Sequence, residues 1–243
     1  MHEEQVCPKI LLTYNGALPD GSITQGGYAD YYRCDAAFVF PIPDALPSEE
    51  AAPMLCGGIT TYAPLKRHGA GPGKKVGILG IGGLGHFGVQ WAVALGADVT
   101  AISSSNRKEA LCKDVLGAHH FLDMSNAADV AAYQHHFDIV LCTANGPDTN
   151  WGDLFNLVAT NGKFVLVAVP EKPISFHAIS IIMRQITVVG SAIGSPNEID
   201  DMLQFAVDKK VRALVQVMPM ADAAAALQKV HHGDARFRIV LEN

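Results

Sequence analysis

The sequence has few cysteines, and no two of them lie close together. They are Cys7, Cys34, Cys56, Cys112 and Cys142, and no C-x-x-C pair occurs. An odd and widely spaced set builds neither a disulfide framework nor a complete local zinc knuckle. Three of the five, Cys34, Cys112 and Cys142, are expected to be small buried hydrophobic residues.

Long apolar runs and charged residues are also scarce. No run approaches the roughly 18 residues that span a bilayer, and the N-terminal MHEEQVCPK lacks the apolar core of a signal peptide. Charged residues make up 17% of the 243 residues, and the formal net charge is −6. No Lys/Arg run is present. We therefore expect a cytoplasmic protein with a large core and with neither a nucleic-acid nor a membrane partner.

Two patterns divide the chain. Residues 1 to about 45 carry turn signals, short aromatic runs and several prolines, which indicates irregular β-structure. From Lys75 onward, short apolar runs alternate with segments of helical period, which predicts βαβ units and a parallel sheet with helices on both faces.

The predicted elements follow from these runs. Strands or apolar runs are expected at 74–80, 98–103, 119–124, 137–144, 163–169, 186–192, 212–218 and 235–242. Helices are expected at 83–97, 106–118, 151–162, 196–209 and 220–232. Asn106 is a candidate N-cap, and Gly96 and Gly117 are candidate helix ends.

A glycine-rich stretch joins the first of these strands to the helix that follows. Gly80, Gly82 and Gly85 form a G-x-G-x-x-G pattern in that position. Such glycines allow a tight turn, a close approach of backbone N–H groups to a pyrophosphate, and close helix–strand packing. The pattern predicts a dinucleotide site at a helix N-terminus; the alternative is a tight turn that binds nothing.

The end of the next strand indicates which dinucleotide is bound. An NAD site has an acidic residue there for the ribose hydroxyls. Here the strand continues as SSSNRK (103–108), with three hydroxyls, Arg107 and Lys108 but no carboxylate. These groups suit a 2′-phosphate and favour NADP. Alternatively, Ser105 and Asn106 only cap a helix and the cations are solvated.

The stretch from Gly26 to His86, which includes PMLCGGITTYAPL and GILGIGGLGH, resembles the medium-chain zinc-dependent alcohol dehydrogenases. It is most similar to the cinnamyl-alcohol-dehydrogenase branch, which includes fungal NADP-dependent alcohol dehydrogenases. The resemblance extends to GDARFRIVLEN at the end of the chain. It implies an α/β fold with a doubly wound Rossmann sheet and a partial GroES-like β domain. Residues 1–45 would be a remnant of that catalytic domain, 46–211 the NADP-binding domain, and 212–243 the return to the catalytic domain.

The resemblance also implies roles for single residues. Cys56 matches a catalytic-zinc ligand, and Thr60 matches a residue beside the nicotinamide. The positions implied to bind cofactor are Gly80, Gly82, Gly83, Leu84 and Gly85 at the pyrophosphate, Ser103, Ser104 and Lys108 at the 2′-phosphate, Thr143 and Ser191 at the nicotinamide, and Arg236 near the pyrophosphate. Cys7 matches one ligand of a structural zinc lobe.

The zinc ligands are incomplete by the same comparison. The family's catalytic zinc also needs an earlier Cys and a His-Glu pair, whereas a catalytic zinc takes about three protein ligands. The adjacent pairs His119–His120, His135–His136 and His231–His232 diverge in direction and do not replace them. His86 is expected to be a helix-start residue near the cofactor. We expect a chain that resembles the last two-thirds of a dehydrogenase, binds NADPH and lacks a complete zinc site.

The activity implied by the resemblance is hydride transfer between NADP(H) and a primary alcohol or aldehyde, in a homodimer and with zinc assistance in intact relatives. An alternative is a zinc-free, catalytically inactive NADP-binding fragment or pseudoenzyme. A third reading is a zinc-independent reductase of the same superfamily; the presence of Cys56 argues against it.

Overall fold

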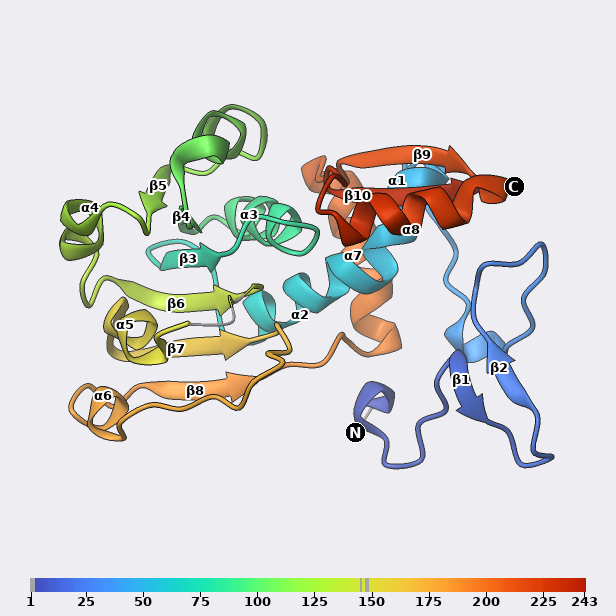
Figure 1. Ribbon diagram of the computed structural model, residues 1–243, viewed down its shortest axis with the longest axis horizontal. Helices are drawn as coiled ribbons and strands as arrows, with labels where there is room; N and C mark the ends of the chain where they lie inside the picture. The colour runs from blue at the N-terminus through green and yellow to red at the C-terminus, as the bar shows by residue number, and fades with distance from the viewer. Residues whose placement is uncertain (1–2, 145, 147–148) are drawn as a thin grey trace.

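The computed structural model describes residues 3–144, 146 and 149–243. Within these residues the largest sheet has six parallel strands, which lie in the left half of Figure 1. The strands are β3 (Lys75–Leu79), β4 (Asp98–Ser103), β5 (His120–Asp123), β6 (Phe137–Cys142), β7 (Val158–Leu166) and β8 (Thr187–Gly190). They lie in the order β5–β4–β3–β6–β7–β8. Numbered from the first strand of the sheet, this is the 3-2-1-4-5-6 order of a doubly wound dinucleotide-binding fold. The predicted α/β class is confirmed.

Helices connect and flank these strands. The α-helices are α1 (Ser48–Pro53), α2 (Ile59–Arg67), α3 (Gly85–Ala94), α4 (Ala127–Ala132), α5 (Trp151–Asn156), α6 (Ile179–Ile182), α7 (Pro196–Lys209) and α8 (Ala223–His231). The 3₁₀ turns are η1 (Glu4–Val6), η2 (Ala36–Phe38), η4 (Asn106–Lys108) and η6 (Met220–Asp222), and the π-helical turns are η3 (Met54–Gly58) and η5 (Leu111–Val115).

Two smaller β units lie outside the sheet. Strands β1 (Tyr14–Ala17) and β2 (Ile23–Gln25) form an antiparallel pair near the N-terminus, which agrees with the predicted irregular β-structure of that region. Strands β9 (Val215–Pro219) and β10 (Arg238–Glu242) pair in parallel and are joined through α8. Figure 1 shows this pair beside α1 and α8.

The central strands are apolar on both faces because each face supports a separate core. In β6, Ile139 and Leu141 belong to a cluster with side chains of α2, α3 and α7. The alternate residues Val140 and Cys142 belong to a second cluster with side chains of α5. This alternation explains why such strands appear in the sequence as continuous apolar runs.

The cysteine predictions are confirmed in two of three cases. Cys112 and Cys142 are buried. The prediction for Cys34 is wrong, because Cys34 is exposed in the region before η2. That region between β2 and α1 contains no buried residue before Leu46 within the described part of the chain, so it has no core for Cys34 to enter.

Two predicted helices differ in the structure, the first in its start and regularity and the second in its end. The segment 106–118 begins as the 3₁₀ turn η4 and continues into the π-helical turn η5, rather than forming one regular helix. Asn106 is not its N-cap; Ser105 holds that position and makes no capping bond through its side chain. The end of this segment is as predicted, since Gly117 has a φ of 81°.

The predicted helix 151–162 ends early, at Asn156, and β7 begins at Val158. Asn161 has a φ of 61°, and its N–H donates to the Arg184 carbonyl at 2.8 Å. A left-handed residue with a distant backbone partner does not continue a helix. Tertiary contacts therefore override the local helical pattern here.

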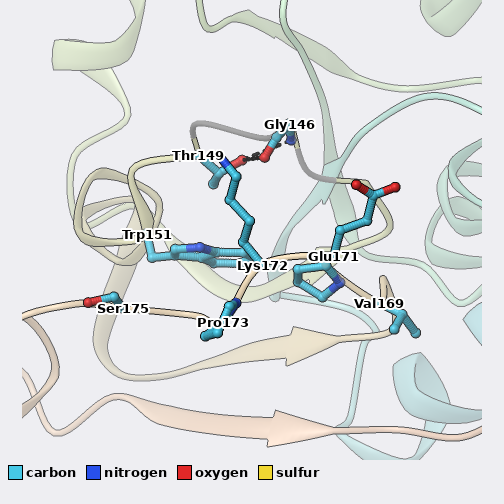
Figure 2. Close-up of a pocket in the computed structure, with 9 residues that line it drawn as sticks. Gly146, Thr149, Trp151, Val169, Glu171, Lys172, Pro173 and Ser175 are labelled. Carbon is cyan, nitrogen blue, oxygen red and sulfur yellow. Dashed lines mark hydrogen bonds between the residues drawn. The ribbon is translucent and has the colours of Figure 1, made fainter.

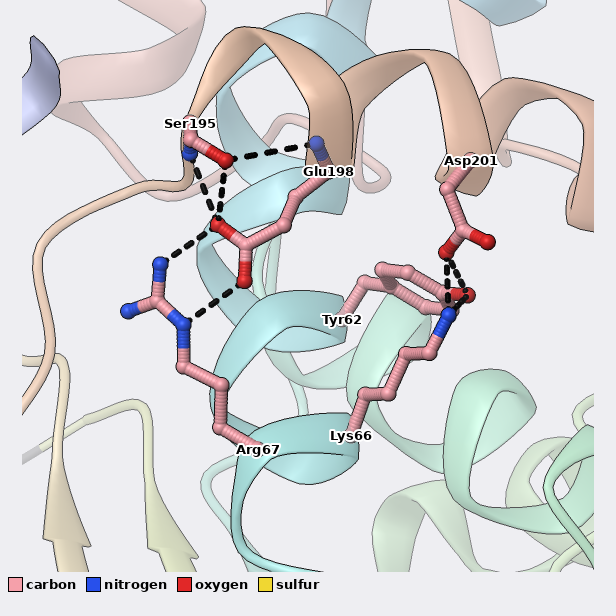
Figure 3. A network of polar contacts seen from close by, with 6 residues as sticks. All are labelled: Tyr62, Lys66, Arg67, Ser195, Glu198 and Asp201. Atoms are coloured by element: carbon pink, nitrogen blue, oxygen red, sulfur yellow. Dashed lines mark hydrogen bonds and ion pairs between the residues drawn. The ribbon is translucent and has the colours of Figure 1, made fainter. Parts of the chain in front are cut away.

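Polar contacts fasten α7 to α2 (Figure 3). Ser195 caps α7 in a reciprocal capping box with Glu198, whose carboxylate also pairs with the Arg67 guanidinium. One turn further along α7, Asp201 accepts from Lys66 and from Tyr62, both at 2.6 Å. Burial opposes the ionisation of Glu198, but the bonds from Arg67 and Ser195 outweigh it and lower the pKa of Glu198.

We expect Glu198→Ala to lower the free energy of unfolding by about 2 kcal/mol, because a capping box and a charge-assisted contact are lost together. Urea unfolding followed by circular dichroism measures the change. Glu109→Ala is the control, since Glu109 pairs with Lys113 only across the exposed face of one helical segment. That variant should lose about 0.5 kcal/mol or less. Equal losses in the two variants would show that the contacts of Glu198 between α2 and α7 stabilise the fold no more than an exposed ion pair does.

Candidate dinucleotide-binding site

The glycine loop connects β3 to α3, and its glycines have different structural roles. Gly80 has a φ of 87°, which favours glycine. A Cβ on Gly85 would lie 1.8 Å from the Gly80 carbonyl oxygen, so α3 begins in direct contact with the turn. Gly82 differs from both, because a Cβ there would meet nothing within 4 Å. The loop is therefore closely packed at Gly80 and Gly85 and open at Gly82.

Thr143 holds the first glycine from the neighbouring strand. It follows β6, and its hydroxyl donates to the carbonyl oxygens of Leu79 at 3.0 Å and Gly80 at 2.7 Å. Its predicted role beside a nicotinamide stays a prediction. In the structure, Thr143 fixes the backbone at the start of the loop.

A cleft of about 570 Å³ opens at the carboxyl ends of β3 and β4. Gly80 and Gly82 line it from the loop, and Ser103, Ser104 and Lys108 line it from the end of β4 and η4. The structure thus brings the predicted pyrophosphate loop and the predicted 2′-phosphate residues to one cleft. Ligands of open α/β sheets bind at this edge, where the strand order reverses.

Lys108 is partly withdrawn from water at the side of this cleft. Its Nζ donates to the Ile81 carbonyl and lies 5.4 Å from the ring centre of Phe237. Burial is the main cause that lowers the pKa of Lys108, and the nearby cations Arg107 and Arg236 lower it further. A carbonyl and an aromatic face therefore stabilise a cation that has lost part of its hydration, and an anion would stabilise it more.

Arg238, which sequence analysis did not single out, lies against the glycine loop. Its Nε donates to the Gly83 carbonyl at 3.0 Å. A Cβ on Gly57 would lie 2.7 Å from Arg238 Nη2, so the guanidinium fills the space beside both glycines. Arg236 is exposed and stays a predicted site residue only. The sequence R-F-R at 236–238 offers two arginines, and only the packing shows that the second one contacts the glycine loop.

Cys56 lies in the π-helical turn η3, directly before α2. Its side chain is exposed, whereas Thr60 in the next turn is buried. Single π-turns inside helices are frequent at functional sites. Trp91 of α3 donates from Nε1 to the Gly58 carbonyl at 3.1 Å, which ties this turn to the nucleotide-binding unit.

The residues of the described chain do not fit a zinc site. No group of three or more His, Cys, Asp or Glu residues with metal-binding geometry occurs within 3–144, 146 and 149–243. Cys7, the predicted remnant of a structural zinc lobe, is exposed, and its sulfur accepts from the Lys9 N–H at 3.4 Å. Cys56 thus has no second and third ligand in this part of the protein, whereas about three are needed.

Ser191 and Leu84 complete the predicted set. Ser191 follows β8, and its Oγ is buried without a hydrogen-bond partner among the described residues. Leu84 occupies the N-cap position of α3 and offers no capping side chain. An orphaned hydroxyl at the carboxyl edge of the sheet is consistent with a bound group that supplies its partner.

A second cavity of about 420 Å³ adjoins the first, since Gly146 and Thr149 line both (Figure 2). Trp151, Val169 and Lys172 are among its other lining residues. None of these residues was predicted as a site residue, because no motif in the sequence marks them.

The sheet order, the glycine loop and the cleft beside it define a dinucleotide-binding protein of the Rossmann type. The chain belongs to the zinc-binding dehydrogenase family, whose model matches residues 83–208. The resemblance inferred from the sequence is confirmed by this match.

Similar proteins include cinnamyl alcohol dehydrogenases from plants and bacteria. The chain is 37% identical to probable cinnamyl alcohol dehydrogenase 6 of Arabidopsis thaliana, over 99% of this chain and 66% of the relative. A Sorghum bicolor cinnamyl alcohol dehydrogenase superposes with a TM-score of 0.93 at 34% identity, covering 98% of this chain and 68% of that one. The Helicobacter pylori enzyme complexed with NADP(H) gives 0.86 at 31% identity, covering 99% and 69%. The chain thus spans about two-thirds of the length of these relatives.

Among the described residues, no helix is both long and apolar enough to span a membrane.

The open position at Gly82 gives a direct test of the cleft. We expect Gly82→Ala to fold like the parent but to weaken NADPH binding by roughly tenfold, about 1.4 kcal/mol, because the methyl group fills the space for the phosphates. Fluorescence titration measures the dissociation constant.

Two other glycine variants serve as controls. Gly27→Ala, also free of neighbours within 4 Å, should leave binding unchanged. Gly85→Ala should destabilise the fold itself because of its contact with Gly80. Unchanged binding in Gly82→Ala would contradict a phosphate site at the loop.

Proposed function

We propose that this chain binds NADP(H) in the cleft at the carboxyl ends of β3 and β4 and acts as an NADP-dependent alcohol dehydrogenase or aldehyde reductase. The proposed reaction is hydride transfer between NADP(H) and a primary alcohol or aldehyde. The observation that carries it is the pairing of an open glycine loop with Ser103, Ser104 and Lys108 in one cleft. The NADP(H) complex of the Helicobacter pylori relative supports the choice of cofactor.

Bound NADP would supply the hydride-accepting ring. The chain's own residues would bind and orient it. Backbone N–H groups at Gly82, Gly83 and the start of α3 would meet the pyrophosphate, where the helix dipole favours negative charge. Lys108, with Ser103 and Ser104, would hold the 2′-phosphate, and Arg238 supplies a further guanidinium beside Gly83. Thr143 holds the loop, and the Ser191 hydroxyl, which has no partner among the described residues, would be available to the nicotinamide.

The second candidate function is a zinc-free NADP-binding module without turnover. It is favoured by the mismatch at Cys56, which is one cysteine without accompanying ligands among the described residues. In a complete site of the family, Cys56 and Cys7 would be zinc ligands and Thr60 would lie beside the nicotinamide. We also propose the domain division of the family for this chain. Its Rossmann domain would span 46–211, and 1–45 and 212–243 would be parts of a catalytic domain.

The proposed assembly is a homodimer in the cytoplasm. Within the described residues, β8 pairs only with β7 and leaves an edge free, and Ile182 and Met183 expose apolar side chains just before it. Unpaired edges beside apolar surface favour association with a second strand. All five cysteines are free thiols, which fits a reducing compartment.

A charge substitution tests the cofactor preference. Ser103→Asp puts a carboxylate at the end of β4, where it repels a 2′-phosphate and accepts from ribose hydroxyls. We expect the ratio of NADPH to NADH affinity to fall by roughly tenfold or more, from a repulsion of about 1–2 kcal/mol. Ser103→Asn is the neutral control. An unchanged affinity ratio would show that the 2′-phosphate does not bind beside Ser103.

Metal analysis combined with an aldehyde-dependent assay of NADPH oxidation separates the two candidate functions. For the 243-residue chain we expect NADPH binding, zinc far below stoichiometric amounts and little turnover, because Cys56 lacks companion ligands. Cys56→Ser should leave NADPH binding unchanged. Stoichiometric zinc with ordinary turnover would contradict the inactive NADP-binding module. It would also show that Cys56 finds further zinc ligands beyond those expected here.

A further inference from the structure

His86 is a fully buried polar residue at the start of α3. Its Nδ1 lies 3.1 Å from the Gly82 carbonyl oxygen, and its Nε2 accepts from the Leu214 N–H at 3.3 Å. The only ring state that satisfies both contacts is neutral, with the proton on Nδ1. The Phe237 ring stacks on the imidazole, with centroids 5.1 Å apart and planes 8° from parallel.

Gln90, one helical turn after His86, contacts the same segment. Its Nε2 donates to the Arg212 carbonyl at 2.9 Å, and its Oε1 accepts from the Arg212 N–H at 3.2 Å. Residues four apart on a helix share one face. Two side chains of α3 thus bind the backbone at alternate residues, 212 and 214, much as a neighbouring strand would.

A second set of hydrogen bonds links residue 214 to the glycine loop. The Leu214 carbonyl accepts from the N–H groups of Phe237 and Arg238, at 3.1 and 3.3 Å. Arg238 in turn donates to the Gly83 carbonyl. Gly82 and Gly83, adjacent in the loop, are therefore linked to Leu214 through His86 on one side and Arg238 on the other.

We propose that His86 is a positioning residue for the cofactor, which holds the open part of the glycine loop in register with residues 212–214 and so with the β9–β10 unit. This inference rests on the proposed NADP site. Gly82 carries the open space for the phosphates and also accepts the His86 contact, so a shift of the imidazole moves the backbone that a pyrophosphate would meet. Burial lowers the pKa of His86 to about 4, which keeps the ring neutral near pH 7.

Two substitutions separate the two halves of the contact. In His86→Asn the amide lies near the position of Nδ1 and can donate to Gly82, but it cannot reach Leu214. In His86→Gln the longer side chain can accept from Leu214. Gln90→Met removes the second link with little change in volume, and keeps the proposal testable if the His86 variants fold poorly. His231→Asn, on the exposed end of α8, is the matched control.

The readouts are amide hydrogen exchange of the full chain without cofactor, and dissociation constants for NADPH and for adenosine 2′-monophosphate, which lacks a pyrophosphate. We expect His86→Asn and Gln90→Met to speed exchange at 212–214 and in the loop 82–86. NADPH binding should weaken roughly three- to tenfold, with adenosine 2′-monophosphate changed by less than about twofold. His86→Gln should recover part of the loss, and His231→Asn should match the parent.

The outcomes separate this inference from the proposed function. Unchanged exchange in the loop, or equal weakening of both ligands, would overturn the positioning role. If the parent chain bound neither ligand, the proposed NADP site would fail, while faster exchange in the loop would still establish that His86 holds it. If the parent bound both ligands and His86→Asn changed neither, the site would stand and the positioning role would fall.

Discussion

The contact between Gly85 and the Gly80 carbonyl is the constraint on which the rest of the site depends. It places the first turn of α3 directly on the end of β3, and a side chain at Gly85 would separate them, whereas a side chain at Gly80 would meet Ala144. The N-terminus of α3 therefore directly follows the glycine loop that lines the cleft. The same helix carries Trp91 to the Gly58 carbonyl, and so fixes the turn that holds Cys56. One close approach of backbone atoms thus sets the positions of the glycine loop and of Cys56.

The fold was largely predictable from the sequence, because its main signals are local. A strand buried on both faces needs a continuous apolar run, and β3, β4 and β6 have one. The helix predicted at 196–209 from its apolar pattern is found at those bounds, and in the structure Ser195 and Glu198 form a capping box at its start. Ser103, Ser104 and Lys108 were correctly predicted to lie near the glycine loop, because adjacent parallel strands end at one edge of the sheet.

The features that sequence reasoning missed depend on distant contacts. Nothing near Arg238 distinguishes it from Arg236, and packing against Gly57 and Gly83 decides between them. The roles of His86 and Gln90 depend on backbone atoms more than 120 residues away. The early end of the helix at Asn156 follows from the partner that Asn161 finds in Arg184. Cys34 was expected in a core, but that region has none before Leu46 in the described structure. In each case the outcome depends on contacts that the neighbouring sequence does not show.

The guanidinium of Arg238 occupies the space that side chains would need at both Gly57 and Gly83. A larger residue at position 57 or 83 would displace the Arg238 guanidinium. A smaller residue at position 238 would leave a gap that a side chain at position 57 or 83 could fill. The three positions therefore form one unit of sequence variation, although they are far apart along the chain. Substitutions that are harmful singly at these positions are expected to compensate one another in pairs, because neighbouring side chains that share one space do not vary independently.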